Sequence, residues 1–354
     1  MKHKILKRIF TAFIAVIISL MCFTVAFAVN SGTCGTNVSW SFNEENGELL
    51  ISGSGTMTDY SSADYVPWRS YTDKISKITV SEGVTSIGKY AFNGCKKAEE
   101  ISIPAGIETI GYGSFDNCSS LKNISIPASV TKINSSPFYY CTSLVEITVS
   151  ESNKKYCSDS NGILYNKDKT ELIQYPCGKK EADFSLPFTV TTVNFGAFAG
   201  APYIKNIILP ESLSEIDSMA FYECTSLKII TIPKNLSMIG EKAFSNCSAI
   251  SDVYFTGTQE KWNSVSIREG NDVLTSATFT YETKGPETAP TDPEENIQET
   301  TSAVQQSTTA VYPQQKLAQK REIIPIIIIV IAILVLILFI VLIRVIIKKP
   351  DKLK

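Results

Sequence analysis

The sequence predicts a solenoid of parallel β-strands, because one motif of 23 residues recurs along most of the chain. The motif is clearest over residues 121–144, where it reads L-x-x-I-x-I-P, then V-x-x-I, then F-x-x-C. Its phenylalanine recurs in two runs, as Phe92, Phe115 and Phe138 and then as Phe198, Phe221 and Phe244. Its cysteine keeps the same period, as Cys95, Cys118 and Cys141 and then as Cys224 and Cys247. Repeats of this length bury their apolar faces against neighbouring copies, which stacks them into a solenoid.

Within one repeat, the pattern assigns a direction to each side chain. Ile124 and Ile126 flank Ser125, so strand alternation places both isoleucines on the inner face and the serine on the outer face. Pro127 lacks an amide donor and ends that strand. The V-x-x-I and F-x-x-C segments bring the chain back with their apolar residues inward. Stacked strands lie about 4.7–4.9 Å apart, so each inner position becomes a row of like residues and belongs to the core.

The repeat resembles the BspA-type leucine-rich repeat. The resemblance rests on L-x-x-I-x-I-P followed by V-T-S-I-G-x-x-A-F-x-x-C, which residues 84–95 match, and it spans residues 34–281. It implies a leucine-rich-repeat solenoid with a parallel β-sheet and irregular or short helical returns, displayed on a cell surface. It also implies an association with adhesion to host matrix proteins and to other microbes. It supplies no catalytic residues.

The segment before the repeats predicts an N-terminal β cap over residues 29–76. Residues 38–51 alternate, turn at Asn46-Gly47 and run back, which is a hairpin signal. A solenoid needs its first coil covered, and this segment is placed to cover it. We expect Trp40 and Trp68 to fill the core of the cap.

The coils occupy residues 77–258, and one of them carries an insertion over residues 150–183. The strand after Ile147 begins 37 residues on, at Phe184, rather than 23. Residues 162–175 read as a hairpin that projects from the solenoid. Two interpretations of it are open: a binding element, or an extra hairpin that shields the core of that coil. Residues 259–282 are expected to form a C-terminal cap with a short helix and a last strand.

The two ends of the chain predict export and anchoring. Residues 1–28 combine a basic start, an apolar run and a small-residue cleavage site, as in a secretory signal peptide. Residues 283–322 are rich in Thr, Pro, Ser and Gln and predict a disordered stalk. Residues 323–347 predict a transmembrane helix, and the basic residues 348–354 predict a cytoplasmic tail.

Charge and histidine content limit the classes of function. The net charge is −2 overall, but the two terminal segments 1–28 and 323–354 each carry +4, which leaves residues 29–322 at −10. An acidic middle argues against nucleic-acid binding, which needs a basic face. The single histidine, His3, lies in the predicted signal peptide. Without it, histidine-dependent triads and histidine metal sites are excluded, and we expect no enzyme activity, no cofactor and no metal site.

Cysteine spacing allows two states of the thiols. The cysteines of the repeat are expected to be free and buried, since a stacked line cannot pair evenly and a free cysteine behaves as a small core residue. Cys157 and Cys177 bracket the inserted hairpin. They are the candidate disulfide, because an exported protein meets an oxidising environment.

The outward strand positions form the candidate ligand face, because solenoids usually bind through such an extended surface. Most of its members are small and polar. The face consists of Thr79, Ser102, Ser125, Thr148, Ser185, Ile208, Thr231 and Tyr254.

These observations predict a single-pass membrane protein with an extracellular solenoid and a short cytoplasmic tail. Its expected function is adhesion to protein or glycan ligands on host or microbial surfaces through the solenoid face. The alternative is a structural spacer of the cell envelope, or between cells, without a specific ligand.

Overall fold

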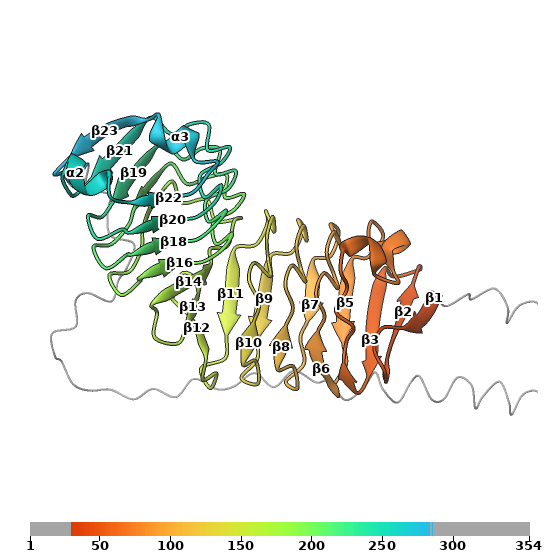
Figure 1. The fold of residues 1–354 in the computed structure, drawn as a ribbon. Helices are drawn as coiled ribbons and strands as arrows, with labels where there is room; N and C mark the ends of the chain where they lie inside the picture. The colour runs from red at the N-terminus through yellow and green to blue at the C-terminus, as the bar shows by residue number, and fades with distance from the viewer. Residues whose placement is uncertain (1–29, 284, 286–354) are drawn as a thin grey trace, which may run out of the picture. The chain divides into compact units, whose positions relative to one another are not determined.

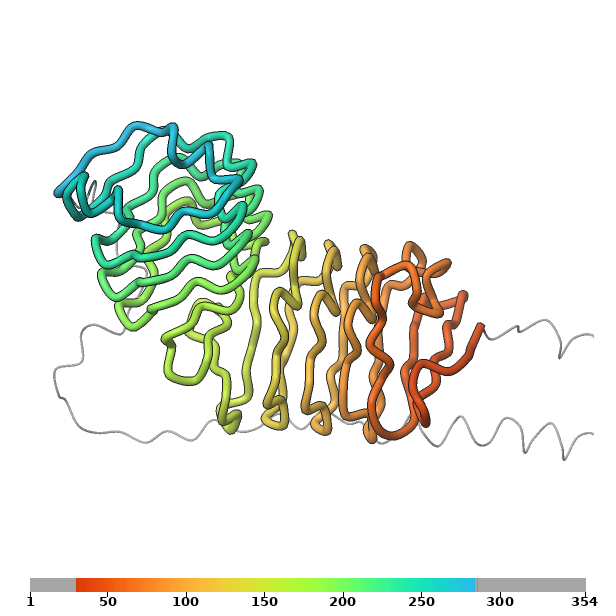
Figure 2. The backbone as a smooth tube through the Cα atoms, in the orientation of Figure 1, coloured from red at the N-terminus to blue at the C-terminus, as the bar shows by residue number. Residues whose placement is uncertain are grey.

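The computed structural model describes residues 30–283 and residue 285, and these form a solenoid of stacked coils (Figure 1). Each coil contributes one short strand to each of two ladders, which the backbone trace in Figure 2 follows. The parallel β solenoid predicted from the 23-residue period is therefore confirmed. The expected signal peptide and residues 323–354 lie outside the described residues, as does almost all of the expected stalk.

The L-x-x-I-x-I segments form the first ladder. Its strands alternate exposed and buried residues, as β9 and β11 show, because one face packs on the core. Its strands pair in parallel in three sheets, β3–β5–β7, β9–β11 and β15–β17–β19–β21–β23, with Cα partners such as Ile124 and Ile147 one repeat apart. The strands of the first ladder are β3 (Glu48–Gly53), β5 (Lys77–Val80), β7 (Glu100–Ser102), β9 (Asn123–Ile126), β11 (Glu146–Val149), β15 (Asp183–Ser185), β17 (Asn206–Ile208), β19 (Ile229–Ile232), β21 (Asp252–Phe255) and β23 (Thr278–Tyr281).

The V-x-x-I segments form the second ladder, in two parallel sheets. Most of its strands are only two residues long, and several bury one isoleucine, such as Ile110 in β8 and Ile216 in β18. The strands of the second ladder are β4 (Gly55–Thr56), β6 (Val84–Ile87), β8 (Thr109–Ile110), β10 (Lys132–Ile133), β14 (Glu171–Gln174), β16 (Thr192–Val193), β18 (Glu215–Ile216), β20 (Met238–Ile239) and β22 (Ser266–Ile267).

An antiparallel hairpin begins the solenoid, as its Asn-Gly turn predicts. Strands β1 (Asn30–Thr33), β2 (Val38–Asn43) and β3 pair antiparallel, and β3 then pairs in parallel with β5 of the first full coil. Two 3-10 helices follow, η1 (Ala63–Tyr65) and η2 (Arg69–Tyr71). Trp68 is fully buried, packs edge-on against Trp40 with 5.8 Å between ring centroids, and donates a hydrogen bond to the carbonyl of Ala91. The two tryptophans therefore fill the core of this segment, as expected.

The inserted hairpin is present, but the expectation that it projects from the solenoid is wrong. Strand β12 (Tyr156–Ser158) pairs antiparallel with β13 (Leu164–Asn166), and β13 pairs antiparallel with β14. Strand β14 then joins the second ladder by pairing in parallel with β16. Leu164 and Ile173 belong to the core of the N-terminal coils, whereas Tyr165 and Leu172 belong to the core of the C-terminal coils. The insertion is buried on both faces because it fills the space between two cores. It therefore matches the shielding interpretation rather than an exposed element.

Rows of like residues fill the core, as the period predicts. Neighbouring phenylalanine rings are stacked, with centroids 5.3 Å apart for Phe115 and Phe138 and 4.8 Å apart for Phe198 and Phe221. Tyr175 of the insertion takes the phenylalanine position and stacks on Phe198 at 5.0 Å. The insertion thus keeps the row continuous at the start of the second run.

The cysteine of F-x-x-C has a specific partner. The Sγ of Cys118 donates to the carbonyl oxygen of Phe92 at 3.3 Å, and the Sγ of Cys141 donates to that of Phe115 at 3.2 Å. Each thiol thus adds a second hydrogen bond to a carbonyl of the previous coil that already accepts one from a backbone amide, and so links adjacent coils. Burial raises the pKa of these thiols, so they remain protonated donors.

The last coil is closed by two short helices and a final strand. Helix α2 (Gln259–Trp262) begins at Thr258, whose side chain accepts a hydrogen bond from the amide of Lys261. Helix α3 (Asp272–Thr275) follows, and β23 pairs in parallel with β21. Trp262 packs against the ring of Phe279, with centroids 4.7 Å apart, which covers the end of the apolar core.

Candidate functional site

The predicted ligand face occupies the outward positions of the first ladder, here called the first row, and it falls in three paired groups because β7 and β9, and likewise β11 and β15, belong to different sheets. Thr79 pairs with Ser102, and Ser125 pairs with Thr148, so their side chains lie one strand spacing apart on the same face. Ser185, Ile208, Thr231 and Tyr254 are paired in turn. The row continues into Leu50 and Thr280, which pair with Thr79 and Tyr254. Sequence reasoning missed these two end members because their strands lack the repeat motif.

Members of the first row differ in accessibility. Ser102, Ser125 and Thr148 are exposed. Thr79 is half-buried and donates a hydrogen bond to the Oε1 of Glu48 at 2.8 Å. These side chains make the N-terminal half of the row the more accessible part.

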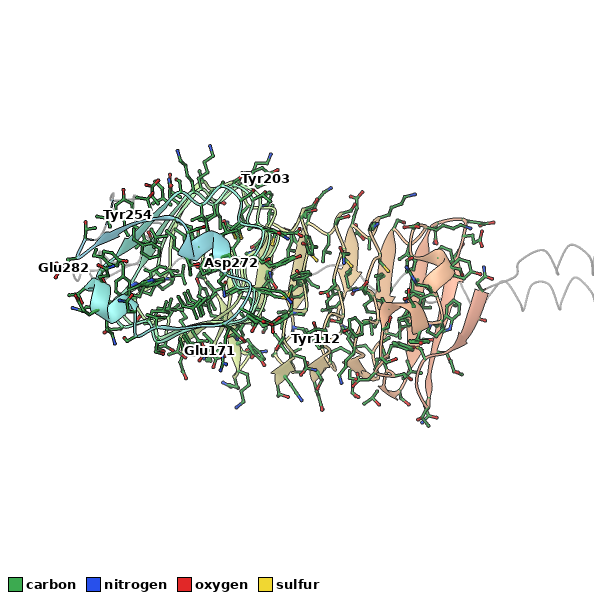
Figure 3. All side chains as sticks on the ribbon, turned by 45° about the horizontal axis from the view of Figure 1, so that its top comes forward. Tyr112, Glu171, Tyr203, Tyr254, Asp272 and Glu282 are labelled. Atoms are coloured by element: carbon green, nitrogen blue, oxygen red, sulfur yellow. The ribbon has the colours of Figure 1, made fainter. Side chains whose placement is uncertain are left out.

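Thr231 corrects the prediction, because it is only 3% exposed and offers no surface to a ligand. Its short side chain lies between the longer side chains of Ile208 and Tyr254 on the adjacent strands. The backbone of Gly285 also approaches the ring of Tyr254, since a Cβ built on Gly285 would lie 2.6 Å from its Cγ. Figure 3 shows Tyr254 and, at the end of the described chain, Glu282. The C-terminal half of the row is therefore partly covered by its own neighbours.

Cys157 and Cys177 are both free in the structure, so the candidate disulfide between them is absent from it. Cys157 lies half-buried in β12, and its Sγ donates to the carbonyl of Asn166 at 3.3 Å. Cys177 is buried, and its Sγ donates to the carbonyl of Ala199 at 3.2 Å. The two side chains bracket the insertion in sequence, but each has a different backbone partner. Cys177 instead extends the row of core cysteines.

This arrangement predicts that one thiol reacts before the others. In the native protein, a water-soluble maleimide is expected to modify Cys157 first, since the other seven described cysteines are buried. Peptide mapping after short exposure to the reagent measures this order. Protection of Cys157 that is relieved only by a reducing agent would show that it is disulfide-bonded after all.

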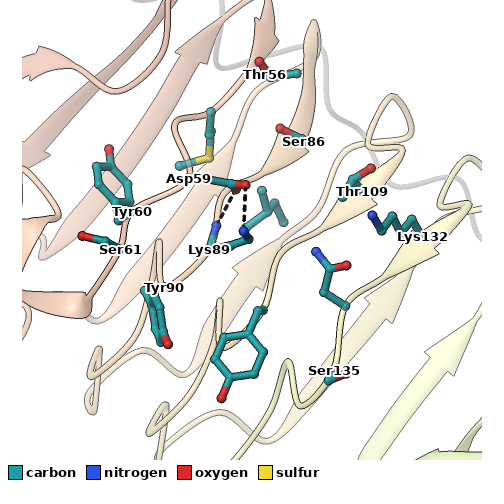
Figure 4. A pocket seen from close by; sticks show the side chains of 14 residues that line it. Thr56, Asp59, Tyr60, Ser61, Ser86, Lys89, Tyr90, Thr109, Lys132 and Ser135 are labelled. Carbon is teal, nitrogen blue, oxygen red and sulfur yellow. Dashed lines mark hydrogen bonds and ion pairs between the residues drawn. The ribbon is translucent and has the colours of Figure 1, made fainter.

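A second surface, the second-ladder groove, lies along the N-terminal run of the second ladder and has a volume of about 1020 Å³ (Figure 4). Its floor contains the outward side chains of four paired strands, namely Thr56, Ser86, Thr109 and Lys132. Tyr90 and Tyr112 line one side, with ring centroids 5.4 Å apart and nearly perpendicular planes. The sequence contains a pattern that predicts this floor. Ser86, Thr109 and Lys132 each occupy the third place of the V-x-x-I segment in their repeat, so they recur every 23 residues. Our sequence reasoning assigned V-x-x-I only to the core.

The charged side chains in this groove differ from those at the equivalent outward positions in the C-terminal run of the second ladder. Lys89 pairs with Asp59 at 3.6 Å between exposed side chains, as the dashed lines in Figure 4 show. Lys132 is exposed and has no charged partner within 4 Å among the described residues. In the C-terminal run, the equivalent outward positions include Glu171 and Glu215. The groove is therefore the more basic part of the second ladder.

The loops of F-x-x-C on the two sides of the insertion contact each other through aromatic side chains. The ring of Tyr112 lies 6.4 Å from that of Phe195, and Tyr139 lies 6.5 Å from Tyr222. The hydroxyl of Tyr140 donates a hydrogen bond to the carboxylate of Glu223. Tyr140 and Glu223 both adopt positive φ, at 58° and 57°, so these loops place polar side chains on strained backbone.

Asp116 is buried beneath these loops, at 8% exposure. Its Oδ1 accepts a hydrogen bond from the backbone amide of Tyr139 at 3.2 Å. Desolvation raises the pKa of this carboxyl from 3.8 to about 7, against the opposing effect of that hydrogen bond. A buried carboxyl of this kind can hold a proton at mildly acidic pH.

No group of three or more His, Cys, Asp and Glu side chains among the described residues is arranged to hold a metal ion. None of the helices between residues 30 and 285 has the length and apolar character needed to cross a membrane.

The fold and its repeats define a leucine-rich-repeat solenoid, and comparison with known proteins identifies its family. The model of the BspA type leucine rich repeat region matches residues 70–181 and 174–284, with six copies. The chain belongs to this family. Comparison with the curated proteins gave no match.

Three solved structures illustrate the likeness. A leucine-rich repeat protein from Eubacterium ventriosum is 29% identical over 64% of this chain and 72% of its own, with a TM-score of 0.45. The pneumococcal vaccine antigen PcpA is 18% identical over 64% of this chain and 82% of its own, with a TM-score of 0.45. A leucine-rich repeat protein from Bacteroides ovatus is 22% identical over 70% and 78%, with a TM-score of 0.31.

Proposed function

We propose that this chain is a non-catalytic binding protein of the cell surface, which holds a protein or glycan ligand on the first row. The observation that carries the proposal is the register of that row. Parallel pairing fixes Ser102 beside Thr79 and Ser125 beside Thr148, so the exposed hydroxyl groups of Ser102, Ser125 and Thr148 are held on a rigid backbone. A preorganised surface of this kind loses little entropy when a ligand binds.

The sequence supports display at the surface. The expected signal peptide, stalk and membrane helix would export the solenoid and hold it outside the cell, with the basic tail in the cytoplasm. Membership of the BspA-type family is consistent with this location. Adhesion to host or microbial surfaces is the function that such a display would serve.

A bulky charge in the middle of the first row is expected to weaken binding strongly without unfolding the protein. Ser125 is exposed, so Ser125→Arg adds a long cation to the row at little cost in stability. Full-length protein would be tested against matrix proteins, mucins, glycans and whole microbial cells. Saturable binding should fall about tenfold or more in the Ser125→Arg variant, because the added side chain blocks close approach.

Ser237→Arg is the matched control, since Ser237 is equally exposed but lies on the loop before β20. It should bind as the unchanged protein does. Equal binding by both variants would place the ligand elsewhere. Absence of saturable binding to every partner would support the structural spacer instead.

A further inference from the structure

We infer that the second-ladder groove is a second binding site, separate from the first row, and that it takes an acidic polysaccharide with a carboxylate at Lys132. The inference rests on the hydroxyl-lined floor, the tyrosine wall and the unpaired cation of one groove. It does not depend on a ligand at the first row.

The floor of the groove presents unused hydrogen-bonding groups. Thr56, Ser86 and Thr109 are register partners, so their hydroxyl groups repeat at one strand spacing, about 4.8 Å. These three hydroxyl groups make no hydrogen bond to other described residues, whereas the equivalent Thr79 of the first row is already bonded to Glu48. A polyhydroxylated chain lying across the strands, from coil to coil, can donate to and accept from all three.

The wall of the groove suits the flat faces of sugar rings. Tyr90 and Tyr112 are half-buried and stand at 83° to each other, so each offers part of a ring. Tyrosine combines an apolar ring with a polar hydroxyl, which matches a sugar that has apolar C–H faces and polar edges. The aliphatic lining residues Met57 and Ile87 are buried, so the groove lacks an apolar pocket of the kind that anchors a protein ligand.

Charge selects an acidic ligand over a neutral one. Lys89 and Asp59 largely offset each other, and such an exposed pair contributes little. Lys132 closes the floor as an exposed cation without a charged partner among the described residues, in a segment whose net charge is −10 over residues 29–322. The same row presents Glu171 and Glu215 in the C-terminal run, which would repel an anion. The basic groove is therefore the part of this ladder that complements a carboxylate.

The test uses full-length protein and two sources of uronate, a hyaluronan octasaccharide and an alginate oligomer of similar length. Calorimetry should show saturable binding of at least one of them, which weakens as salt is raised because the carboxylate contact is exposed. Tighter binding of hyaluronan would indicate a ligand of the host type, and tighter binding of alginate would indicate a ligand of the microbial type. A neutral maltoheptaose should bind at least about tenfold more weakly, since it has no carboxylate for Lys132.

Lys132→Glu is expected to lower the affinity about tenfold or more, because it reverses the positive charge that Lys132 places on the floor. Lys205→Glu is the matched control, since it changes the net charge equally on an exposed lysine before β17, and it should leave the affinity unchanged within about twofold. Thr109→Val keeps the shape of the side chain but removes a hydroxyl, and should lower the affinity severalfold. Circular dichroism checks that each variant is folded.

Several outcomes would overturn the inference. If Lys132→Glu and Lys205→Glu lower the affinity for the uronate equally, or if poly-glutamate binds as tightly as the uronate, the binding is non-specific charge attraction and the site is rejected. If neither uronate binds, the site is also rejected. Loss of cell adhesion in Ser125→Arg with unchanged behaviour of Lys132→Glu towards uronates would leave the proposed function in place and reject this second site.

Discussion

Replacement of Phe138 by alanine is expected to lower the free energy of unfolding by about 3–5 kcal/mol. The ring is fully buried and stacks on Phe115 with centroids 5.3 Å apart and planes 9° apart. Its removal would leave a cavity in a row that continues from coil to coil, and a solenoid cannot collapse around such a gap without shifting the stacked backbone. Urea unfolding followed by circular dichroism would measure the change.

Phe188→Ala provides a matched control for this prediction. Phe188 is 76% exposed, so the same substitution should change the stability by less than about 0.5 kcal/mol. The core divides at the insertion into two clusters, and Phe138 lies in the first of them, so Phe138→Ala should shift the unfolding of the N-terminal coils. A negligible effect of Phe138→Ala on every transition would show that the phenylalanine row does not support the fold.

The second large effect concerns pH, and it is expected at Asp116. The pKa of this buried carboxyl is raised to about 7, so the folded state holds the proton more tightly than the unfolded chain, where the value is near 3.8. The stabilising contribution is complete below about pH 4 and is lost as the pH rises through 7, because the charge must then be buried. A shift of this size corresponds to about 4 kcal/mol between those limits.

Asp116→Asn isolates this contribution from that of the other carboxylates. The amide resembles the protonated acid and can still accept the hydrogen bond from the amide of Tyr139. The variant should match the unchanged protein near pH 4 and be more stable by up to about 4 kcal/mol at pH 8. Asp168→Asn, at an exposed position, controls for the change in charge. Parallel stability curves for Asp116→Asn and the unchanged protein would contradict the prediction.

The sequence by itself determined the repeating architecture. The contacts within a coil and between adjacent coils recur at a fixed spacing, so the period of Phe92, Phe115 and Phe138 was enough to predict a stacked core. Strand alternation around Ser125 likewise assigned the outward first row. Both inferences depend only on the pattern within one repeat and on contacts with adjacent repeats, and the sequence contains this pattern in many copies.

The tertiary structure decided the features that break the repeat. The insertion reads as a surface hairpin, yet Leu164 and Tyr165 pack into different cores, and only the three-dimensional pairing of β12, β13 and β14 shows this. Thr231 has the same pattern as its exposed equivalents but is covered by larger neighbours on adjacent strands. The second-ladder groove arises because four side chains from separate coils line one hollow with Tyr90 and Tyr112. Burial and concavity depend on residues distant in the sequence, so the period of a single coil does not encode them.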